Sequence, residues 1–590
     1  MKEKSKNNLN TIRKATGDLF TAMPDIVTVK IVLGIVSALV SVVNVSLLAN
    51  ITDCAGRLIN GEPVMNVFAV NVAGFISCGV FLQFGSVLAY YMDNILIVPK
   101  MEFFHHRLSD HLVDISLEAT HDPQIQNMFW RAKDAIYQDR IMAVFMTVFN
   151  ILPTAIQLIG TLAVLFNYSP VLVALAFISV FPSALLSFWI GRREYGFSVE
   201  HTQTSRLSHY LWEIVTKKET VRENRIYGFM DYLKKRFLDV NQEFRLARKK
   251  LLLKEDAGRG VAELLKNILY IVALVFAVGL VGKNVITVGM FAACIGVFAS
   301  MQGKATDLFD CLARIDAGCK YANDYYDFLN LPKEISGAAV AEKTIQNIEL
   351  ANVSYGYQNG QKYAVDDASL TVKRGQFTVI VGENGSGKTT LSKLILGLYK
   401  PQKGELSIDG RPVTGYSCAS YLKHYSVAIQ NFERYAVSLG DNVRIGSISS
   451  DGRNMDDLFA VLDLAEVRER LGGYDSMLGI EFGDADLSGG EWQRIALARA
   501  MFKNADVVVL DEPTSAIDPM LEYDLLNQFL NVAKEKTCIV ISHRIGLCKK
   551  ADNIIVMEKG RIVGQGRHEY LVENNAKYRE LWNAQSKWYE

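Results

Sequence analysis

The sequence predicts a multidomain membrane protein, with an N-terminal six-helix all-α transmembrane domain followed by an α/β domain. Two observations predict this fold class. Half of the 590 residues are hydrophobic, and the mean hydropathy of +0.12 is high for a chain that lies wholly in water. The long apolar stretches fall early in the chain, whereas the remainder alternates short apolar runs with polar segments. We therefore expect a transmembrane domain over 1–330, a linker over 331–345, an α/β domain over 346–582 and a tail over 583–590.

Six apolar stretches are each near the ~20 residues that a helix needs to cross ~30 Å of hydrocarbon. One such stretch alone would also suit a core helix of a large soluble protein. Six in succession would not, because no soluble core needs so many helices that are apolar on every side. The expected membrane helices are 26–50, 65–91, 141–166, 170–190, 261–282 and 285–303.

The connections between these helices alternate in length and charge. Residues 167–170 and 282–284 form tight turns, whereas 92–140 and 191–260 are long, polar and patterned as helices. The second long segment is rich in lysine and arginine, and this enrichment marks the cytoplasmic side of a membrane. The N-terminus is also basic, and 9–23 has the pattern of an amphipathic helix on the inner surface. The sequence thus predicts a multi-pass protein of the cell membrane, with both termini and the C-terminal domain in the cytoplasm.

Polar residues within the spans have two explanations. One explanation is that they line a cavity. The other is that they form hydrogen bonds between helices, and for each residue this second explanation is at least as good.

The eight cysteines show no C-x-x-C spacing, so neither an intrachain disulfide nor a zinc site is expected. The net charge is +0, and nothing in the chain indicates nucleic-acid binding. The polar residues within the predicted spans, which line a cavity or bond helices together, are Asn71, Gln83, Asn150, Gln157 and Gln302.

A glycine-rich loop in the second half fits the pattern G-x-x-x-x-G-K-[ST] without a mismatch. It follows the apolar run 377–381, expected to be a buried strand, and precedes a helical segment. Such a loop surrounds a phosphate with backbone N–H groups, and the helix N-terminus adds partial positive charge. Lys388 would reach the β- and γ-phosphates and Thr389 would bind Mg²⁺, so the loop predicts ATP and Mg²⁺ as ligands. The loop and the start of its helix are Gly382, Glu383, Asn384, Gly385, Ser386, Gly387, Lys388, Thr389 and Thr390.

Two adjacent carboxylates follow a second apolar run, 507–510, which is also expected to be a buried strand. Ligands of open α/β sheets bind at the carboxyl ends of the strands. Asp511 is therefore predicted to hold Mg²⁺ through its water shell, and Glu512 to act as the general base for an attacking water. The alternative is an acidic helix cap, which the neighbouring glycine-rich loop makes less favourable.

Residues 346–582 resemble the ATP-binding cassette family. The resemblance is carried by the glycine-rich loop, the two carboxylates and the run Leu487-Ser488-Gly489-Gly490-Glu491. In this family the signature motif, here Ser488, Gly489 and Gly490, binds the γ-phosphate of an ATP held by a different cassette. The motif departs from the commonest family pattern, because Glu491 stands where glutamine is frequent.

The resemblance assigns roles to four further residues. Gln430 matches the family's Q-loop glutamine, which binds at the metal site and links it to the membrane domain. Asp518 lies in a segment that resembles the D-loop. His543 matches the switch histidine that contacts the γ-phosphate. Tyr357 lies where the family stacks an aromatic ring on adenine, and Tyr355 is the alternative for that role.

Nearly the whole chain resembles an exporter-type half-transporter, in which six membrane helices precede one cassette. The resemblance implies two coupling helices, near Leu117–Phe129 and Tyr210–Arg222, and a dimer with a second half-transporter, either identical or closely related. It implies export of a hydrophobic or amphipathic substrate such as a peptide, lipid or drug. The alternatives are import of a metal-chelate of the siderophore type and an ATPase regulator that transports nothing. A regulator is expected to have a degenerate site, and this site is intact.

Overall fold

The computed structural model describes residues 2–59, 61–95, 97–283, 285–334, 337–341, 344–357, 362–448, 452–479, 487–512, 536–543 and 545–585. The chain divides into two compact units. The first comprises Met1–Ile115 and Ala119–Lys333, and the second Ser116–Glu118 and Glu334–Glu590. The division falls within 331–345, the predicted linker.

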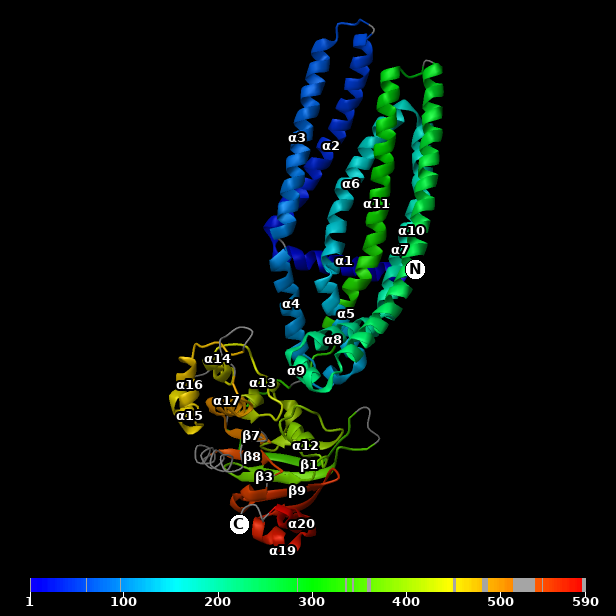
Figure 1. The fold of residues 1–590 in the computed structure, drawn as a ribbon. Helices are drawn as coiled ribbons and strands as arrows, with labels where there is room; N and C mark the ends of the chain where they lie inside the picture. Colours follow the sequence, from blue (N-terminus) through cyan, green and yellow to red (C-terminus); the bar gives the residue numbers. More distant parts are fainter. Residues whose placement is uncertain are drawn as a thin grey trace. The chain divides into compact units, whose positions relative to one another are not determined.

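The described part of the first unit is entirely helical (Figure 1). Long helices follow one another in an up-and-down arrangement, and shorter helices connect them at one end. The helices are α1 (Lys2–Ala22), α2 (Pro24–Ile59), α3 (Met65–Ile95), α4 (Ile97–Asp114), α5 (Pro123–Tyr137), α6 (Arg140–Tyr168), α7 (Pro170–Glu200), α8 (Thr202–Thr216), α9 (Lys218–Tyr227), α10 (Met230–Gly282) and α11 (Val288–Leu329).

Within the described residues, five helices are long and apolar enough to cross a membrane: α2, α3, α6, α7 and α10. They contain the first five predicted spans. The sixth predicted span, 285–303, coincides with the start of α11 but is not one of the five. Its apolar stretch is short, because Gln302 and Lys304 end it, so its crossing of the membrane stays a prediction.

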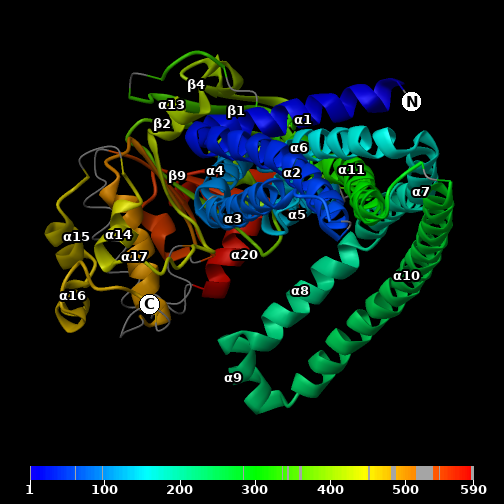
Figure 2. The same ribbon diagram turned by 90° about the horizontal axis from the view of Figure 1, so that it is seen from above.

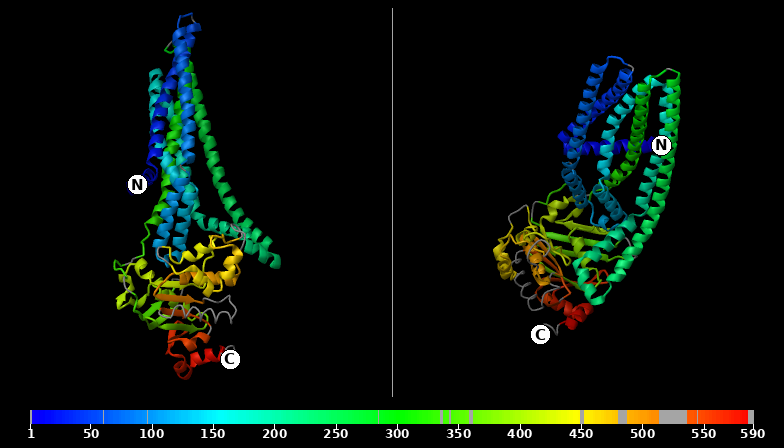
Figure 3. Two further views of the ribbon diagram at one scale, coloured as in Figure 1. Left: turned by 90° about the vertical axis from the view of Figure 1, so that its left-hand side faces the viewer. Right: turned by 45° about the horizontal axis from the view of Figure 1, so that its top comes forward.

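The long polar segments form helices that continue the spans, as the sequence predicts. α10 has 53 residues, far more than a bilayer needs. Figures 2 and 3 show α8, α9 and the first part of α10 as an arm that projects from the other helices of this unit. The two segments predicted as coupling helices overlap the start of α5, the end of α8 and the start of α9. Asp122 caps α5 by accepting a hydrogen bond from Gln124 N at 2.7 Å. Their docking on cassettes stays a prediction.

Close packing and a few polar contacts hold this unit together. α11 lies beside α6 and α7, and α2 beside α3. At Gly160 on α6, a Cβ would lie 2.3 Å from Val42 Cγ2 on α2, so only glycine permits this approach. Gln302 donates a hydrogen bond of 2.7 Å to Ser179 Oγ on α7, which makes it a residue that bonds helices together. By contrast, Asn71 bonds to Val67 O of its own helix at 2.8 Å.

The amphipathic segment 9–23 falls within α1, which runs across the bundle (Figure 1). Its buried face, with Ala15 and Leu19, packs in a core cluster that includes residues of α6 and α11. Tyr326 donates a hydrogen bond of 2.9 Å to Asp18, and Arg107 pairs with the same carboxylate at 2.7 Å. α1 is therefore anchored to the other helices of its unit.

The second unit is an α/β domain with two sheets. A six-stranded sheet in the order β10-β9-β3-β8-β7-β6 is parallel except for β10, and a four-stranded sheet, β2-β1-β4-β5, is antiparallel. The strands are β1 (Asn347–Tyr355), β2 (Val365–Lys373), β3 (Phe377–Gly382), β4 (Lys403–Ile408), β5 (Arg411–Pro412), β6 (Tyr425–Ala428), β7 (Val507–Asp511), β8 (Thr537–Ile541), β9 (Asn553–Glu558) and β10 (Arg561–Gly566).

Both faces of the parallel sheet are covered. Val379 and Val381 of β3 pack in one hydrophobic cluster, whereas Ile380 between them packs in a second cluster. This alternation explains why the strand reads as a continuous apolar run. The helices of this unit are α12 (Lys388–Ile395), α13 (Cys418–Leu422), α14 (Leu439–Arg444), α15 (Met455–Val461), α16 (Ala465–Leu471), α17 (Gly489–Phe502), α19 (His568–Asn574) and α20 (Ala576–Gln585).

Candidate active site

The glycine-rich loop connects β3 to α12, as the sequence predicts, and its glycines are required by its geometry. Gly385 and Gly387 have φ values of 77° and 103°, in the region that favours glycine. A Cβ on Gly387 would also lie 2.4 Å from Ala364 O. The loop can therefore turn tightly from the strand into the N-terminus of the helix, where backbone N–H groups suit an anion.

Lys388, the first residue of α12, folds back over this loop. Its side chain is almost completely buried, and Nζ donates to Gly382 O at 3.0 Å and to Glu383 O at 2.9 Å. Burial lowers the pKa of Lys388, while the nearby carboxylates of Glu512 and Asp511 act in the opposite direction. The loop carbonyls thus hold the ammonium group at the end of the parallel sheet.

Asp511 ends β7, and its charge acts on Lys388. It is only 6% exposed, and its Oδ1 has no hydrogen-bond partner among the described residues. Burial and the charge of Glu512 raise the pKa of Asp511 to about 6, against the opposing effects of Lys393 and Lys388. A buried carboxylate oxygen without a partner is costly, so this atom suits a cation or a bound water.

Glu512 has an unusual backbone and two side-chain partners. Its φ of 47° is rare for a residue with a side chain and is typical of positions where function justifies the strain. Oε2 accepts a hydrogen bond of 2.7 Å from Gln430 Nε2, and Oε1 contacts His543 Nε2. Burial and the charge of Lys388 lower the pKa of His543, although Glu512 opposes this. The neutral imidazole is thereby favoured.

Lys388, Glu512 and its two partners line one pocket of about 600 Å³, whereas Asp511 precedes Glu512 in the chain and is not part of the lining. Tyr357 lies at its edge, is 44% exposed, and its hydroxyl is 3.1 Å from Thr390 Oγ1. Tyr355 is only 5% exposed and stacks on Tyr399 with 5.0 Å between ring centroids, so the geometry favours Tyr357 as the ring available to a ligand. The pocket is lined by Tyr357, Ala364, Asn384, Gly385, Gly387, Lys388, Thr389, Thr390, Gln430, Glu512 and His543.

The signature residues Ser488, Gly489 and Gly490 do not line this pocket. Ser488 caps α17, and Glu491 completes a capping box by accepting a hydrogen bond of 2.7 Å from Ser488 N. Glu491 also pairs with Arg470 at 2.8 Å. The ion pair with Arg470 explains a glutamate here, because glutamine could complete the capping box but not this pair. Asp518 lies outside the described residues.

Two C-terminal residues contact the site and were not predicted from the sequence. Gln585 donates to His543 O at 2.7 Å and accepts from Ile545 N at 3.2 Å. Lys577 pairs with Glu383 of the glycine-rich loop at 2.5 Å. Both belong to α20, which extends three residues into 583–590, the predicted tail. They lie in no motif, and only the fold brings them to the site.

Comparisons with known proteins agree with this arrangement. Residues 365–515 match a family profile described as ABC transporter, and 141–304 match one described as ABC transporter transmembrane region. The chain is 29% identical to the subtilin transport ATP-binding protein SpaT of Bacillus subtilis, over 79% of this chain and 77% of that protein. It is 31% identical to the ATP-dependent lipid A-core flippase of a Polaromonas species, over 73% of this chain and 72% of that protein.

A solved structure has the same fold. The structure of a bacterial Atm1-family ABC exporter with ATP bound matches with a TM-score of 0.78 at 20% identity, and the match covers 94% of this chain and 98% of that one. One chain here joins a membrane-spanning helical unit to an α/β unit with a complete phosphate loop. The chain therefore belongs to the ABC transporter family and is a membrane transporter driven by ATP hydrolysis.

Proposed function

We propose that the protein exports an amphipathic substrate from the cytoplasm and that two copies, or this chain and a closely related one, form the transporter. The observation that carries the ATP-driven part of this proposal is the pocket in which Lys388, Gln430, Glu512 and His543 come together beside the glycine-rich loop. A protein that regulated ATP use without hydrolysis would not need this complete set of groups.

The chemistry that we infer is attack by water on the γ-phosphate of ATP. Glu512 accepts a proton from the water, the bond from the γ-phosphorus to the bridging oxygen breaks, and ADP and phosphate are the products. Lys388 binds the phosphates. His543 contacts the γ-phosphate, and Gln430 keeps the carboxylate of Glu512 in place before substrate binds. Tyr357 stacks on the adenine ring.

Magnesium fits the residues at this site. Asp511 has the buried Oδ1, without a partner among the described residues, that suits a cation. Thr389 and Gln430, which line the pocket, offer a hydroxyl and an amide oxygen. These three residues would hold Mg²⁺, which neutralises phosphate charge when bound.

A second subunit would complete the catalytic site. Ser488, Gly489 and Gly490 lie at the N-terminus of α17, where backbone N–H groups suit a phosphate, yet they line no part of their own chain's pocket. We propose that they bind the γ-phosphate of ATP held by the partner, and that Asp518 acts in the same interface. Closure of two cassettes on two ATP molecules would then switch the membrane helices between two access states.

An amphipathic peptide is the substrate class that we favour. The name of the Bacillus subtilis relative assigns it to transport of subtilin, and the Polaromonas relative is described as a lipid A-core flippase. From these two relatives we infer an amphipathic substrate and export, not import. We place the cassette and both termini in the cytoplasm, since 191–260 is rich in basic residues.

Inside-out membrane vesicles test this proposal. ATP is expected to drive a fluorescent amphipathic peptide into the lumen of vesicles that contain the wild-type protein, and Glu512→Gln is expected to abolish this uptake. ATP-dependent uptake by right-side-out vesicles instead, lost in the same variant, would show import and overturn the proposal.

A further inference from the structure

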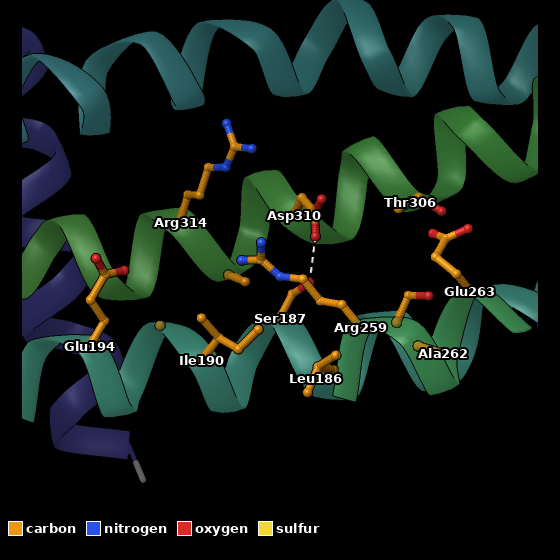
Figure 4. Close-up of a pocket in the computed structure, with 13 residues that line it drawn as sticks. Leu186, Ser187, Ile190, Glu194, Arg259, Ala262, Glu263, Thr306, Asp310 and Arg314 are labelled. Atoms are coloured by element: carbon orange, nitrogen blue, oxygen red, sulfur yellow. Dashed lines mark hydrogen bonds between the residues drawn. The ribbon is translucent and has the colours of Figure 1, made fainter. Parts of the chain in front are cut away.

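A second pocket lies within the helical unit, between α7, α10 and α11. It has a volume of about 420 Å³, and charged side chains from all three helices line it (Figure 4). The charged residues are Glu194 on α7, Arg259 and Glu263 on α10, and Asp310 and Arg314 on α11. Such a concentration of charge next to membrane-crossing helices is costly and points to a function.

The three carboxylates of the pocket already have partners. Glu194 pairs with Arg248 at 3.4 Å, and Glu263 pairs with Lys266 at 2.9 Å. Asp310 accepts a hydrogen bond of 2.5 Å from Ser187 Oγ. Because the first two carboxylates are paired with cations, Asp310 is the lining carboxylate that remains without an ion pair among the described residues.

The two arginines of the pocket differ from Glu194 and Glu263 in their ion pairing. Neither Arg259 nor Arg314 forms an ion pair with any residue that the structure describes. Figure 4 shows the side chain of Arg259 extending toward Asp310, whereas that of Arg314 lies on the other side of the α11 ribbon. Ser183 Oγ, on the third helix, is buried and has no hydrogen-bond partner within the described ranges. The pocket is therefore lined by two arginines and one carboxylate that form no ion pair among the described residues, together with an unsatisfied hydroxyl. The charge of Arg259 also acts on the buried Glu255 of α10.

We propose that this pocket binds the carboxylate end of the transported peptide, with Arg259 and Arg314 as the cationic groups. A guanidinium binds a carboxylate with two parallel hydrogen bonds, which gives orientation as well as affinity. Asp310 accepts hydrogen bonds from peptide N–H groups, and Leu186 and Ile190 contact an apolar side chain. This inference rests on the proposed export of a peptide and names the end of the substrate that is recognised.

A cysteine reporter in the pocket tests the charge preference without knowledge of the natural substrate. Thr306 lines the pocket and takes no part in the proposed binding, so Thr306→Cys is made in a full-length, cysteine-free protein in nanodiscs. Its rate of reaction is measured with anionic 2-sulfonatoethyl and cationic 2-trimethylammonioethyl methanethiosulfonate. The ratio of the labelling rate with the anionic reagent to that with the cationic reagent is expected to be about tenfold higher at this cysteine than at an exposed cysteine.

Replacement of the arginines supplies the decisive comparison. Arg259→Gln together with Arg314→Gln is expected to remove the anionic preference, whereas the two Arg→Lys changes keep the charge and should keep the preference. Arg225→Gln, an exposed position on α9, is the matched control. A preference that is absent in the starting protein, or that survives loss of both arginines, would overturn the proposal.

Protection of the same cysteine identifies the ligand. An amphipathic peptide with a free C-terminal carboxylate is expected to slow labelling by at least about fivefold more than the same peptide with a C-terminal amide. Equal protection by the two peptides, or protection that follows the phosphatidylglycerol content of the nanodisc instead, would contradict peptide recognition. Failure of vesicle export with an intact anionic preference would contradict the proposed function but not this site.

Discussion

Gln430 Nε2 donates a hydrogen bond of 2.7 Å to Glu512 Oε2. The two residues are 82 positions apart, and the sheet brings them together because β6, which precedes Gln430, pairs directly with β7, which precedes Glu512. The proposed general base is therefore held by Gln430, which the resemblance assigns to a segment that links the metal site to the membrane domain. A movement of that segment would change the position of the base.

Gln430→Ala is expected to lower the ATP hydrolysis rate about tenfold to a hundredfold, because a hydrogen bond to a charged group contributes ~1.5–3 kcal/mol. Nucleotide affinity should change less. Steady-state phosphate release and equilibrium binding of ATP measure the two effects. Gln565→Ala, an exposed change on β10, is the control, and a rate equal to that of this control would argue against a role for Gln430.

Lys388→Ala is expected to act at the binding step. Its ammonium group is buried against the loop carbonyls and lines the pocket, so its removal leaves the phosphates without a charged donor. ATP affinity should fall at least about tenfold. Calorimetric titration checks this with Lys423→Ala, an exposed position in the same unit, for comparison. Unchanged affinity would refute phosphate binding by Lys388.

Gln585 is expected to position His543 by donating a hydrogen bond to the backbone carbonyl of His543. Gln585→Ala removes both of its hydrogen bonds, each with a net value of ~0.5–1.5 kcal/mol, so kcat should fall about three- to tenfold with little change in KM for ATP. Gln585→Glu keeps an acceptor for Ile545 N but lacks the donor to His543, and it should lose a similar amount. If Gln585→Glu retained full kcat, the bond to His543 would have no catalytic consequence.

The topology can be tested by labelling from each side of the membrane. Pro63 lies in the turn between α2 and α3, and Lys234 lies near the start of α10. Cysteines placed singly at these positions in a cysteine-free protein are expected to react with an impermeant thiol reagent from opposite sides, with Lys234→Cys on the cytoplasmic side. Labelling of both from one side would contradict the predicted arrangement of helices.

The sequence was sufficient for the parts of the fold that follow from local pattern. The strand before Gly382 and the strand before Asp511 are continuous apolar runs because both faces of the parallel sheet are buried, and such runs are recognisable without a structure. The predicted membrane spans are also continuous apolar runs, and they are recognisable without a structure. Helix ends are less predictable, since α7 and α10 continue through polar residues and glycines beyond their apolar stretches.

Other contacts depend on tertiary structure and have no local signal. Gln585 reaches His543, and Lys577 reaches Glu383, only because α20 folds back on the α/β unit. The charged pocket of the helical unit likewise combines positions on three helices that are more than 100 residues apart at the extremes. Ser187 and Asp310 look unremarkable in the sequence, and their pairing follows from helix packing alone.

The most direct test of the account is ATP hydrolysis by purified Glu512→Gln protein. The carboxylate of Glu512 lies between Gln430 and His543 at the carboxyl end of β7, and the amide cannot accept a proton from water. Hydrolysis should fall about a hundredfold to ten-thousandfold while ATP binding persists, because a positioned base contributes about that much. The control is Glu573→Gln, an exposed position on α19, which should leave turnover unchanged. Near-normal turnover in Glu512→Gln would contradict the assignment of Glu512 as the general base.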